Sequence, residues 1–178
     1  MRKFILVIVN VFLMSIVPVT NAVEDDGFLN PVDLDLRYYF EQLERLPDRL
    51  GVICWASYEM HKEGRHHNAQ ALLNVCSDKG LVPSMLLLAN MYELGLSSDT
   101  KLPKLSALLL KRAAQTNDSR GQLYYGIALL EGKGVKINTR IAKQWLTLAA
   151  NQGDPDAKQI LSNISSFQAN KEQLALTR

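Results

Sequence analysis

The two cysteines, Cys54 and Cys76, are the most reactive side chains in this 178-residue chain. Thiols can form a disulfide, bind a metal or act as a redox pair, and an even number favours a disulfide where a chain is exported to an oxidising compartment. Arg65 lies midway between them, at the predicted turn of a helix hairpin. Because each helix rises by ~1.5 Å per residue, the two cysteines reach the same height on facing helices. We therefore predict a Cys54–Cys76 disulfide.

Two other states of the cysteine pair are open from the sequence. Both thiols could be buried and free. A redox-active pair is the less favoured alternative, because reactive pairs usually sit close together in the sequence at an exposed helix start.

Three histidines, His61, His66 and His67, cluster near the same turn and are candidate metal ligands. A metal site needs side chains that converge on one point and partners that hold them in place. His66 and His67 are adjacent in the sequence, so on a helix they point in different directions. We therefore expect a solvated turn here, with no bound metal or cofactor.

Other motifs of catalytic sites are missing from the sequence. There is no Gly-x-Ser-x-Gly nucleophile motif. The segment Gly132-Lys133-Gly134 lacks the preceding strand and the Lys-Ser/Thr that a phosphate-binding loop requires. The acidic pair Asp25-Asp26 falls in a polar stretch without apolar periodicity, where solvated carboxylates are expected. We therefore expect that the protein is not an enzyme.

The first 22 residues have the pattern of a secretory signal peptide, with cleavage after Ala22. Arg2 and Lys3 precede the apolar run 4–17, and Pro18 ends it. The run is shorter than the ~20 residues of a membrane span, so we favour cleavage over an uncleaved anchor. The sequence thus predicts a periplasmic or secreted protein with no stable membrane span after cleavage.

Removal of this segment also changes the charge of the chain. Without Arg2 and Lys3, the 20 basic residues of the full sequence fall to 18, which equals the 18 acidic residues. A near-neutral chain has no basic stripe of the kind that binds nucleic acid. We therefore expect no nucleic-acid partner.

The remaining sequence carries apolar residues at helical spacing, interrupted by glycine and proline. A flexible polar lead, 23–31, precedes a helical repeat domain, 32–168. A first helix begins near Pro31 and ends at Pro47, and three helix hairpins follow. We place the repeats at 48–80, 82–117 and 119–153, a capping helix at 154–168 and a C-terminal tail at 169–178.

Similar residues recur in the hairpins at a nearly fixed spacing. Gly121 lies 37 residues after Ser84 and 36 residues before Ala157. A fixed period of helix pairs predicts an all-α solenoid in which each hairpin buries its apolar face on the next. Small residues such as Ala142 allow the helices of a hairpin to approach closely, and Trp145 fills the wider gap between hairpins.

The third hairpin closely resembles a Sel-one-like repeat (SLR), a relative of the tetratricopeptide repeat. The pattern is carried in order by Gly121, Tyr125-Gly126, Leu129, Gly132-Lys133-Gly134-Val135, Ile141-Ala142, Trp145 and Ala149-Ala150-Asn151-Gln152-Gly153. The second hairpin matches in part, through Leu88-Ala89, Tyr92, Gly95, Leu109 and Ala113-Ala114, with Asn117 in place of the closing glycine. The first hairpin is closer to a plain tetratricopeptide unit. The resemblance implies a right-handed α-solenoid of antiparallel helix hairpins, about three repeats with flanking helices, of the exported bacterial type.

The resemblance also implies a partner-binding surface. In tetratricopeptide and SLR proteins, the first helix of each pair lines the concave face. The residues that we expect at inward positions are Asn90, Glu93, Arg120, Leu123, Ile127, Glu131, Asp156, Gln159 and Asn163. Such a mixture of amides, charges and apolar groups suits a peptide or protein segment.

The sequence therefore predicts a non-catalytic scaffold or adaptor of the bacterial cell envelope that binds another envelope or secreted protein. Three alternatives stay open. The concave face could be solvated or covered by the tail. The protein could bind or modify cell-wall fragments, as proposed for disulfide-rich relatives. It could also be a structural subunit that stacks end to end.

Overall fold

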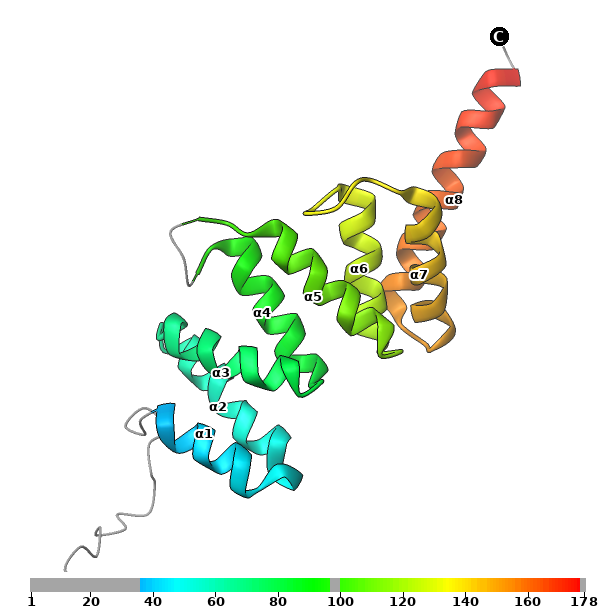
Figure 1. The fold of residues 1–178 in the computed structure, drawn as a ribbon. Helices are drawn as coiled ribbons and strands as arrows, with labels where there is room; N and C mark the ends of the chain where they lie inside the picture. The colour runs from blue at the N-terminus through cyan, green and yellow to red at the C-terminus, as the bar shows by residue number, and fades with distance from the viewer. Residues whose placement is uncertain (1–35, 97–99, 177–178) are drawn as a thin grey trace, which may run out of the picture.

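The computed structural model of the chain describes residues 36–96 and 100–176, and every regular element in these ranges is a helix (Figure 1). In order these are α1 (Leu36–Arg45), a short 3-10 helix η2 (Pro47–Arg49), α2 (Leu50–Lys62), α3 (His66–Asp78), α4 (Val82–Leu94), α5 (Pro103–Gln115), α6 (Ser119–Glu131), α7 (Thr139–Asn151) and α8 (Pro155–Leu176). The predicted all-α class is confirmed. The predicted signal peptide and lead, 1–31, lie outside the described residues.

The helices from α2 to α7 form three successive antiparallel hairpins, α2–α3, α4–α5 and α6–α7. The second helix of each hairpin packs on the first helix of the next, and α7 packs on α8 in the same way. Figure 1 shows the hairpins following one another in a row, with α8 extending beyond the last. This arrangement is the α-solenoid that the residue spacing predicted.

The six helices of the three hairpins are each 13 residues long, and the first helices share one pattern of burial. The fourth, seventh, eighth and eleventh positions of the first helices are buried in every hairpin. These residues are Ile53, Ala56, Ser57 and Met60 in α2, Met85, Leu88, Ala89 and Tyr92 in α4, and Gln122, Tyr125, Gly126 and Leu129 in α6. Helical position within the hairpin therefore decides which side chains enter the core.

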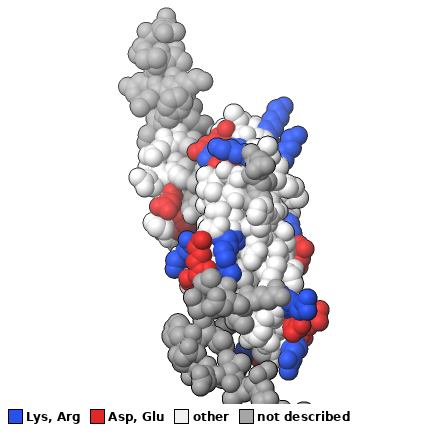
Figure 2. All heavy atoms as spheres, turned by 90° about the vertical axis from the view of Figure 1, so that its left-hand side faces the viewer, with Lys and Arg blue, Asp and Glu red and all other residues white. Residues whose placement is uncertain are grey.

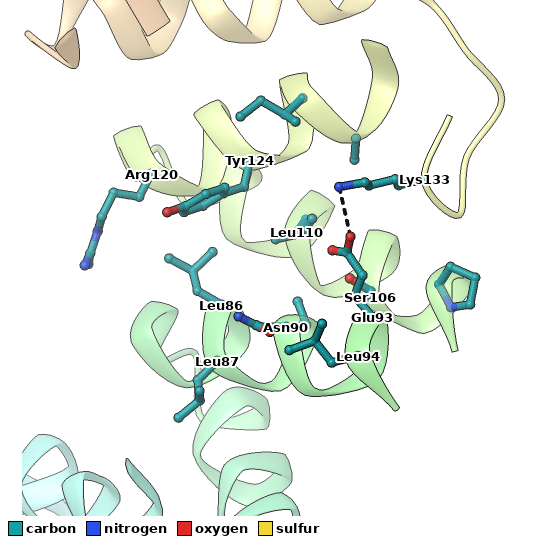
Figure 3. A pocket seen from close by; sticks show the side chains of 14 residues that line it. Leu86, Leu87, Asn90, Glu93, Leu94, Ser106, Leu110, Arg120, Tyr124 and Lys133 are labelled. Carbon is teal, nitrogen blue, oxygen red and sulfur yellow. Dashed lines mark ion pairs between the residues drawn. The ribbon is translucent and has the colours of Figure 1, made fainter. Parts of the chain in front are cut away.

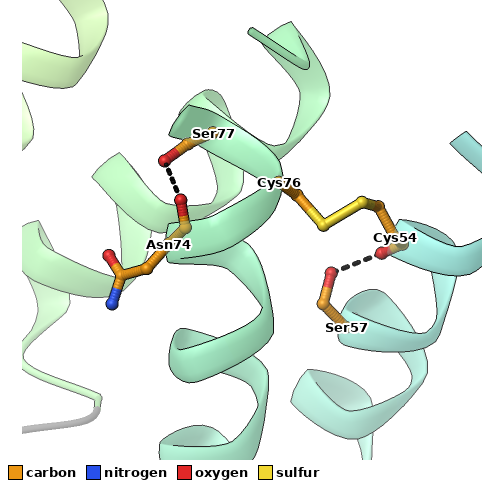
Figure 4. Close-up of a disulfide and its surroundings, with 5 residues drawn as sticks. All are labelled: Cys54, Ser57, Asn74, Cys76 and Ser77. Atoms are coloured by element: carbon orange, nitrogen blue, oxygen red, sulfur yellow. Dashed lines mark hydrogen bonds between the residues drawn. A yellow bond between two sulfur atoms is a disulfide. The ribbon is translucent and has the colours of Figure 1, made fainter. Parts of the chain in front are cut away.

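The predicted Cys54–Cys76 disulfide is present and joins α2 to α3, with a Cα–Cα distance of 6.1 Å (Figure 4). Cys54 is the fifth residue of α2 and Cys76 the eleventh of α3. A leucine and an alanine hold these two positions in the other hairpins: Leu86 with Ala113, and Leu123 with Ala149. The disulfide thus replaces a leucine–alanine pair in the first hairpin.

Two glycines allow the second and third hairpins to approach closely. A Cβ atom on Gly121 would lie under 3.0 Å from the backbone of Ala113, so only glycine lets α6 pack this tightly on α5. Gly134 has a positive φ of 68° and lies against the backbone of Pro103, at the start of α5. This contact holds the turn after α6, and with it Lys133, over the second hairpin.

Asn117 stands where the repeat pattern expects a glycine, and the structure explains the exchange. Its φ is 65°, in the left-handed region that asparagine enters more readily than most residues. Its side-chain oxygen accepts a hydrogen bond from Nε2 of the buried Gln122 at 3.0 Å. Gln152 donates in turn to Gln122 Oε1 at 2.8 Å. The side chain therefore connects two hairpins as well as ending a helix.

The last helix continues into the segment that we placed in the tail. The capping helix was placed at 154–168 and the tail at 169–178, and α8 runs to Leu176. Asp154 caps its start by accepting a hydrogen bond from the Ala157 N–H at 2.9 Å. After Pro155 the sequence contains neither glycine nor proline, and residues 169–176 are rich in good helix formers, so nothing local stops the helix. Among the described helices, none has both the length and the hydrophobicity needed to cross a membrane.

Candidate partner-binding site

A pocket of about 620 Å³ lies between α4 and α6, the first helices of the second and third hairpins (Figure 3). Its lining comprises Leu86, Leu87, Ala89, Asn90, Glu93 and Leu94 from α4, Pro103, Ser106 and Leu110 from α5, Arg120, Tyr124, Ile127 and Ala128 from α6, and Lys133 from the following turn. We refer to it as the α4–α6 pocket.

The pocket forms because α4 and α6 both pack on α5, which keeps them apart from each other. Its floor is mostly apolar and includes the buried side chains of Ala89, Leu110 and Ala128. Leu94 and Tyr124 are large apolar side chains that are 53% and 46% exposed. An apolar floor with exposed apolar walls can take up an apolar side chain of a partner.

One end of the pocket is closed by an ion cluster around Lys133. Its Nζ lies 2.8 Å from Glu131 Oε2 and 3.0 Å from Glu93 Oε1. Hydrogen bonds from Lys133 to Glu131 and Glu93 raise the pKa of the lysine above its ordinary value, so it stays a cation. Glu93 belongs to α4, Glu131 is the last residue of α6, and Lys133 lies in the turn that follows α6. The cluster therefore bridges two hairpins, with its charges compensated internally.

Arg120 lies at the opposite end of the pocket, next to Tyr124 (Figure 3). Its one ion pair among the described residues is with Asp118 Oδ2 at 3.9 Å, which is beyond hydrogen-bonding distance. Asp118 is the N-cap of α6, and its Oδ1 accepts a hydrogen bond from the Gly121 N–H at 2.9 Å. The exposed guanidinium thus retains donors that an incoming carboxylate could accept from.

Uncharged side chains dominate the surface seen from the left-hand side of Figure 1. Lys, Arg, Asp and Glu occur there in small mixed groups around a broad uncharged area (Figure 2). On this face, the described residues form no extended stripe of one charge. Such a surface suits a partner that makes mostly uncharged contacts with a few ion pairs.

Four of the sequence-predicted residues line the pocket together: Asn90, Glu93, Arg120 and Ile127. Glu131 joins them indirectly through its ion pair with Lys133. The structure does not bring the three residues predicted on α8 to this pocket. Asp156, Gln159 and Asn163 are exposed on that helix.

The expectation for Leu123 requires correction. Only 4% of this residue is exposed, and it packs in a core cluster with Leu146, Ala149 and Ala157. Leu123 is the fifth residue of α6, the position that Cys54 holds in α2, and it packs against Leu146 and Ala149 in the second helix of its own hairpin. A side chain in that core is not accessible to a partner.

The sequence reasoning missed the other ten lining residues, among them Leu86, Leu87, Leu94, Tyr124 and Lys133. The signal for Leu87 and Tyr124 was their shared place as the sixth residue of α4 and of α6. Lys133 carried no such signal, because its role depends on how the turn folds back over α5.

The histidine cluster is arranged differently from a metal site. The His61 and His66 rings lie side by side with centroids 5.1 Å apart, and His67 is exposed. Burial, followed by the nearby His66, lowers the pKa of His61. Across residues 36–96 and 100–176, no three His, Cys, Asp or Glu side chains gather as a metal site would require.

Comparison with known proteins identifies the repeats. The family model described as Sel1 repeat matches residues 82–118 and 119–154. No match was found among curated proteins. Sel1 repeat proteins generally act in protein–protein interaction.

Three solved structures have a similar fold. A Sel1 repeat protein from Oxalobacter formigenes aligns with a TM-score of 0.58 and 20% identity, over 62% of this chain and 45% of the other. The protective antigen c5321 of uropathogenic Escherichia coli, which displays an SLR fold, aligns with a TM-score of 0.60 and 19% identity, over 74% and 28%. The cysteine-rich protein B of Helicobacter pylori aligns with a TM-score of 0.55 and 20% identity, over 72% and 98%.

This chain therefore spans less than half the length of the first two proteins. At such identities, the likeness concerns the fold. Residues 82–154 form two Sel1 repeats, and the resemblance of the chain to the Sel1-like repeat family is confirmed.

Proposed function

We propose that the protein is a non-catalytic adaptor of the bacterial cell envelope that binds a segment of another envelope or secreted protein in the α4–α6 pocket. The observation that carries this proposal is the pocket itself. It combines an apolar floor with an ion cluster at one end and the guanidinium of Arg120 at the other. A polypeptide segment offers side chains of both kinds at a short spacing.

The disulfide supports an exported location. Disulfides form and persist in the periplasm and outside the cell, and they are rare in the bacterial cytosol. The Cys54–Cys76 bond is buried, with 3% and 0% of the two residues exposed, as expected of a structural crosslink. This agrees with the signal-peptide pattern in residues 1–22.

The chemistry of the pocket supports binding over catalysis. A group that acts as a general base near neutral pH needs a pKa close to that pH. Lys133 lines the pocket, but its pKa is shifted upward by Glu131 and Glu93, which keeps it protonated. Lys133 is therefore suited to holding the ion cluster together and not to accepting a proton.

The proposal can be tested by site-specific crosslinking in intact cells. A photo-reactive amino acid is placed at Asn90, which lines the pocket, or at Leu108, which is 54% exposed on α5 and outside it. We expect a discrete adduct with an envelope protein from position 90 and none from position 108. Tyr124→Ala, which removes a pocket wall, should abolish the adduct. An adduct that forms equally at both positions, or that survives Tyr124→Ala, would contradict the proposed site.

A further inference from the structure

The first hairpin exposes two aromatic side chains that the α4–α6 pocket does not use. Trp55 and Tyr58 of α2 are 60% and 40% exposed, and their ring centroids lie 4.8 Å apart. Lys62 lies with its Nζ 5.4 Å from the Tyr58 ring centroid. Two neighbouring aromatic rings that are exposed to solvent can stack with a ring of a partner. We call Trp55 and Tyr58 the aromatic pair.

The repeat register places the aromatic pair on the same face as the pocket. Trp55 is the sixth residue of α2, as Leu87 is of α4 and Tyr124 of α6. Tyr58 is the ninth residue of α2, as Asn90 and Ile127 are of the next two first helices. All four of these equivalent residues line the α4–α6 pocket: Leu87, Asn90, Tyr124 and Ile127. The aromatic pair is therefore the counterpart, one hairpin earlier, of the residues that line the pocket.

The charges along this face indicate a direction for the occupant. Lys62 is compensated by Glu59 at 3.1 Å, and Lys133 is compensated by two carboxylates. Arg120 has only the weak contact with Asp118 at 3.9 Å among the described residues. It belongs to α6, whereas the aromatic pair belongs to α2. An acidic group is thus favoured at the α6 end and a ring at the α2 end.

A single apolar anchor in the pocket would not hold a partner firmly. Burying one leucine-sized side chain strengthens binding by about 10- to 150-fold, whereas a micromolar complex requires an association constant of about a million per molar. Contacts on both sides of the anchor are therefore needed. The structure offers an open cation on one side and exposed rings on the other.

We propose that the partner segment crosses α4 in an extended form, with a carboxylate on Arg120, an apolar side chain in the α4–α6 pocket and a proline or aromatic ring on the aromatic pair. This inference rests on the proposed function and specifies the partner's sequence. Because α2 and α4 both pack on α3, and packed helices lie about 8–10 Å apart, the axes of α2 and α4 are at most ~20 Å apart. An extended chain advances ~3.3 Å per residue. The ring should therefore follow the apolar anchor by about three to six residues, depending on where in the pocket the anchor lies.

The test uses a displayed library of random short peptides, selected on the exported chain. Enriched peptides are then synthesised and titrated against the protein. Trp145→Phe leaves Trp55 as the single tryptophan, since the chain contains two. We expect enriched peptides to share an acidic residue, a neighbouring apolar residue and a spaced ring, and to shift the fluorescence of Trp55.

Substitutions then assign each contact by calorimetry. Trp55→Ala and Arg120→Glu should each weaken binding by about tenfold. Leu108→Ala is the matched control at a similarly exposed apolar residue outside this face, and it should bind like the parent protein. Because Trp55, Arg120 and Leu108 are all exposed, far-UV circular dichroism should show the same fold in each variant.

The outcomes separate this inference from the proposed function. If Tyr124→Ala weakens peptide binding but Trp55→Ala and Arg120→Glu do not, the contacts at Arg120 and at the aromatic pair are refuted and the pocket alone remains as the binding site. Failure to enrich any peptide, or binding unaffected by Tyr124→Ala, would overturn both. A soluble cell-wall fragment that shifts Trp55 fluorescence where no peptide does would also overturn both.

Discussion

Removal of the Cys54–Cys76 disulfide is the perturbation whose effect the structure specifies best. The bond closes a loop with a sequence separation of 22 residues. Loop-closure entropy for this separation corresponds to about 3 kcal/mol of unfolding free energy. We therefore expect the double variant Cys54→Ala, Cys76→Ala to lose about 3 kcal/mol or more, since truncation also leaves unfilled space in the core.

The other hairpins supply a matched control for the packing part of this loss. Leucine and alanine hold the equivalent positions there, as Leu86 with Ala113. The double variant Cys54→Leu, Cys76→Ala introduces the same pair into the first hairpin. It should be more stable than the double-alanine variant, because it restores buried apolar volume. It should remain less stable than the oxidised protein, because it does not constrain the unfolded chain.

The location of the loss distinguishes this reasoning from a general destabilisation. In a solenoid each repeat contacts only its neighbours, so hairpins open partly independently. Hydrogen–deuterium exchange, with urea unfolding followed by circular dichroism, should show faster exchange first in α2 and α3 of the double-alanine variant. The reasoning is refuted if that variant is as stable as the oxidised protein, or if protection falls first in α6 and α7.

Three further predictions concern packing, pH and the ion cluster. Gly121→Ala should lower the free energy of unfolding by about 1–3 kcal/mol, because the added Cβ would overlap the backbone of α5. Gly51→Ala is the control: the space around this glycine of α2 is open, so the added methyl group should raise the free energy of unfolding by about 0.5–1 kcal/mol. Urea unfolding measures both changes. Burial and His66 hold the pKa of His61 in the folded protein below 6.5, so the unfolded chain binds the proton more readily and stability is lost as the pH falls through 6.5. The thermal midpoint of a His61→Gln variant should therefore depend less on pH in that window, and an unchanged slope would exclude His61 as the cause. Glu93→Gln should reduce stability by less than about 1 kcal/mol, an effect that disappears in high salt, because Glu93 and Lys133 are both substantially exposed; a larger or salt-independent loss would count against this account.

The sequence was informative about the fold because the signals were local and repeated. The repeat placed at 82–117 begins at Val82, where α4 (Val82–Leu94) also begins. The boundaries of α4 follow from Pro83 in the first turn and Gly95 with a φ of 74° at the end. The disulfide followed from equal heights on two facing helices, which needs only the rise per residue and the place of the turn.

The site was less predictable, because it depends on the exact rotation of each helix. Leu123 and Tyr124 are adjacent in α6, yet one is in the core and the other is on the pocket wall. A single residue turns a helix by about 100°, so an error of one position exchanges buried and exposed sides. Lys133 could not be placed at all, since its position depends on the close contact between Gly134 and α5.

The aromatic pair shows a related limit. Tyr58 follows Cys54 at helical spacing in the sequence, and large apolar residues in such a stripe are usually buried. Whether they are buried depends on the neighbouring element. Here α1 packs on α2 and α3, yet it leaves Trp55 and Tyr58 exposed. The sequence shows that these aromatic residues are present, but it does not show how much of each ring a neighbouring helix buries.

The position of the disulfide connects stability to the proposed partner site. In a solenoid, a central hairpin is held on both sides, whereas a terminal one has a full neighbour on one side only. Among the described residues, the first hairpin packs on α4 through α3, and on its other side it contacts the short helix α1. It also lacks the close glycine approach that Gly121 provides between the later hairpins. A covalent bond between α2 and α3 compensates for the missing contacts. Because the aromatic pair lies on α2, the same bond holds its rings in register with the pocket, so that reduction should weaken a two-ended peptide more than one anchored in the pocket alone.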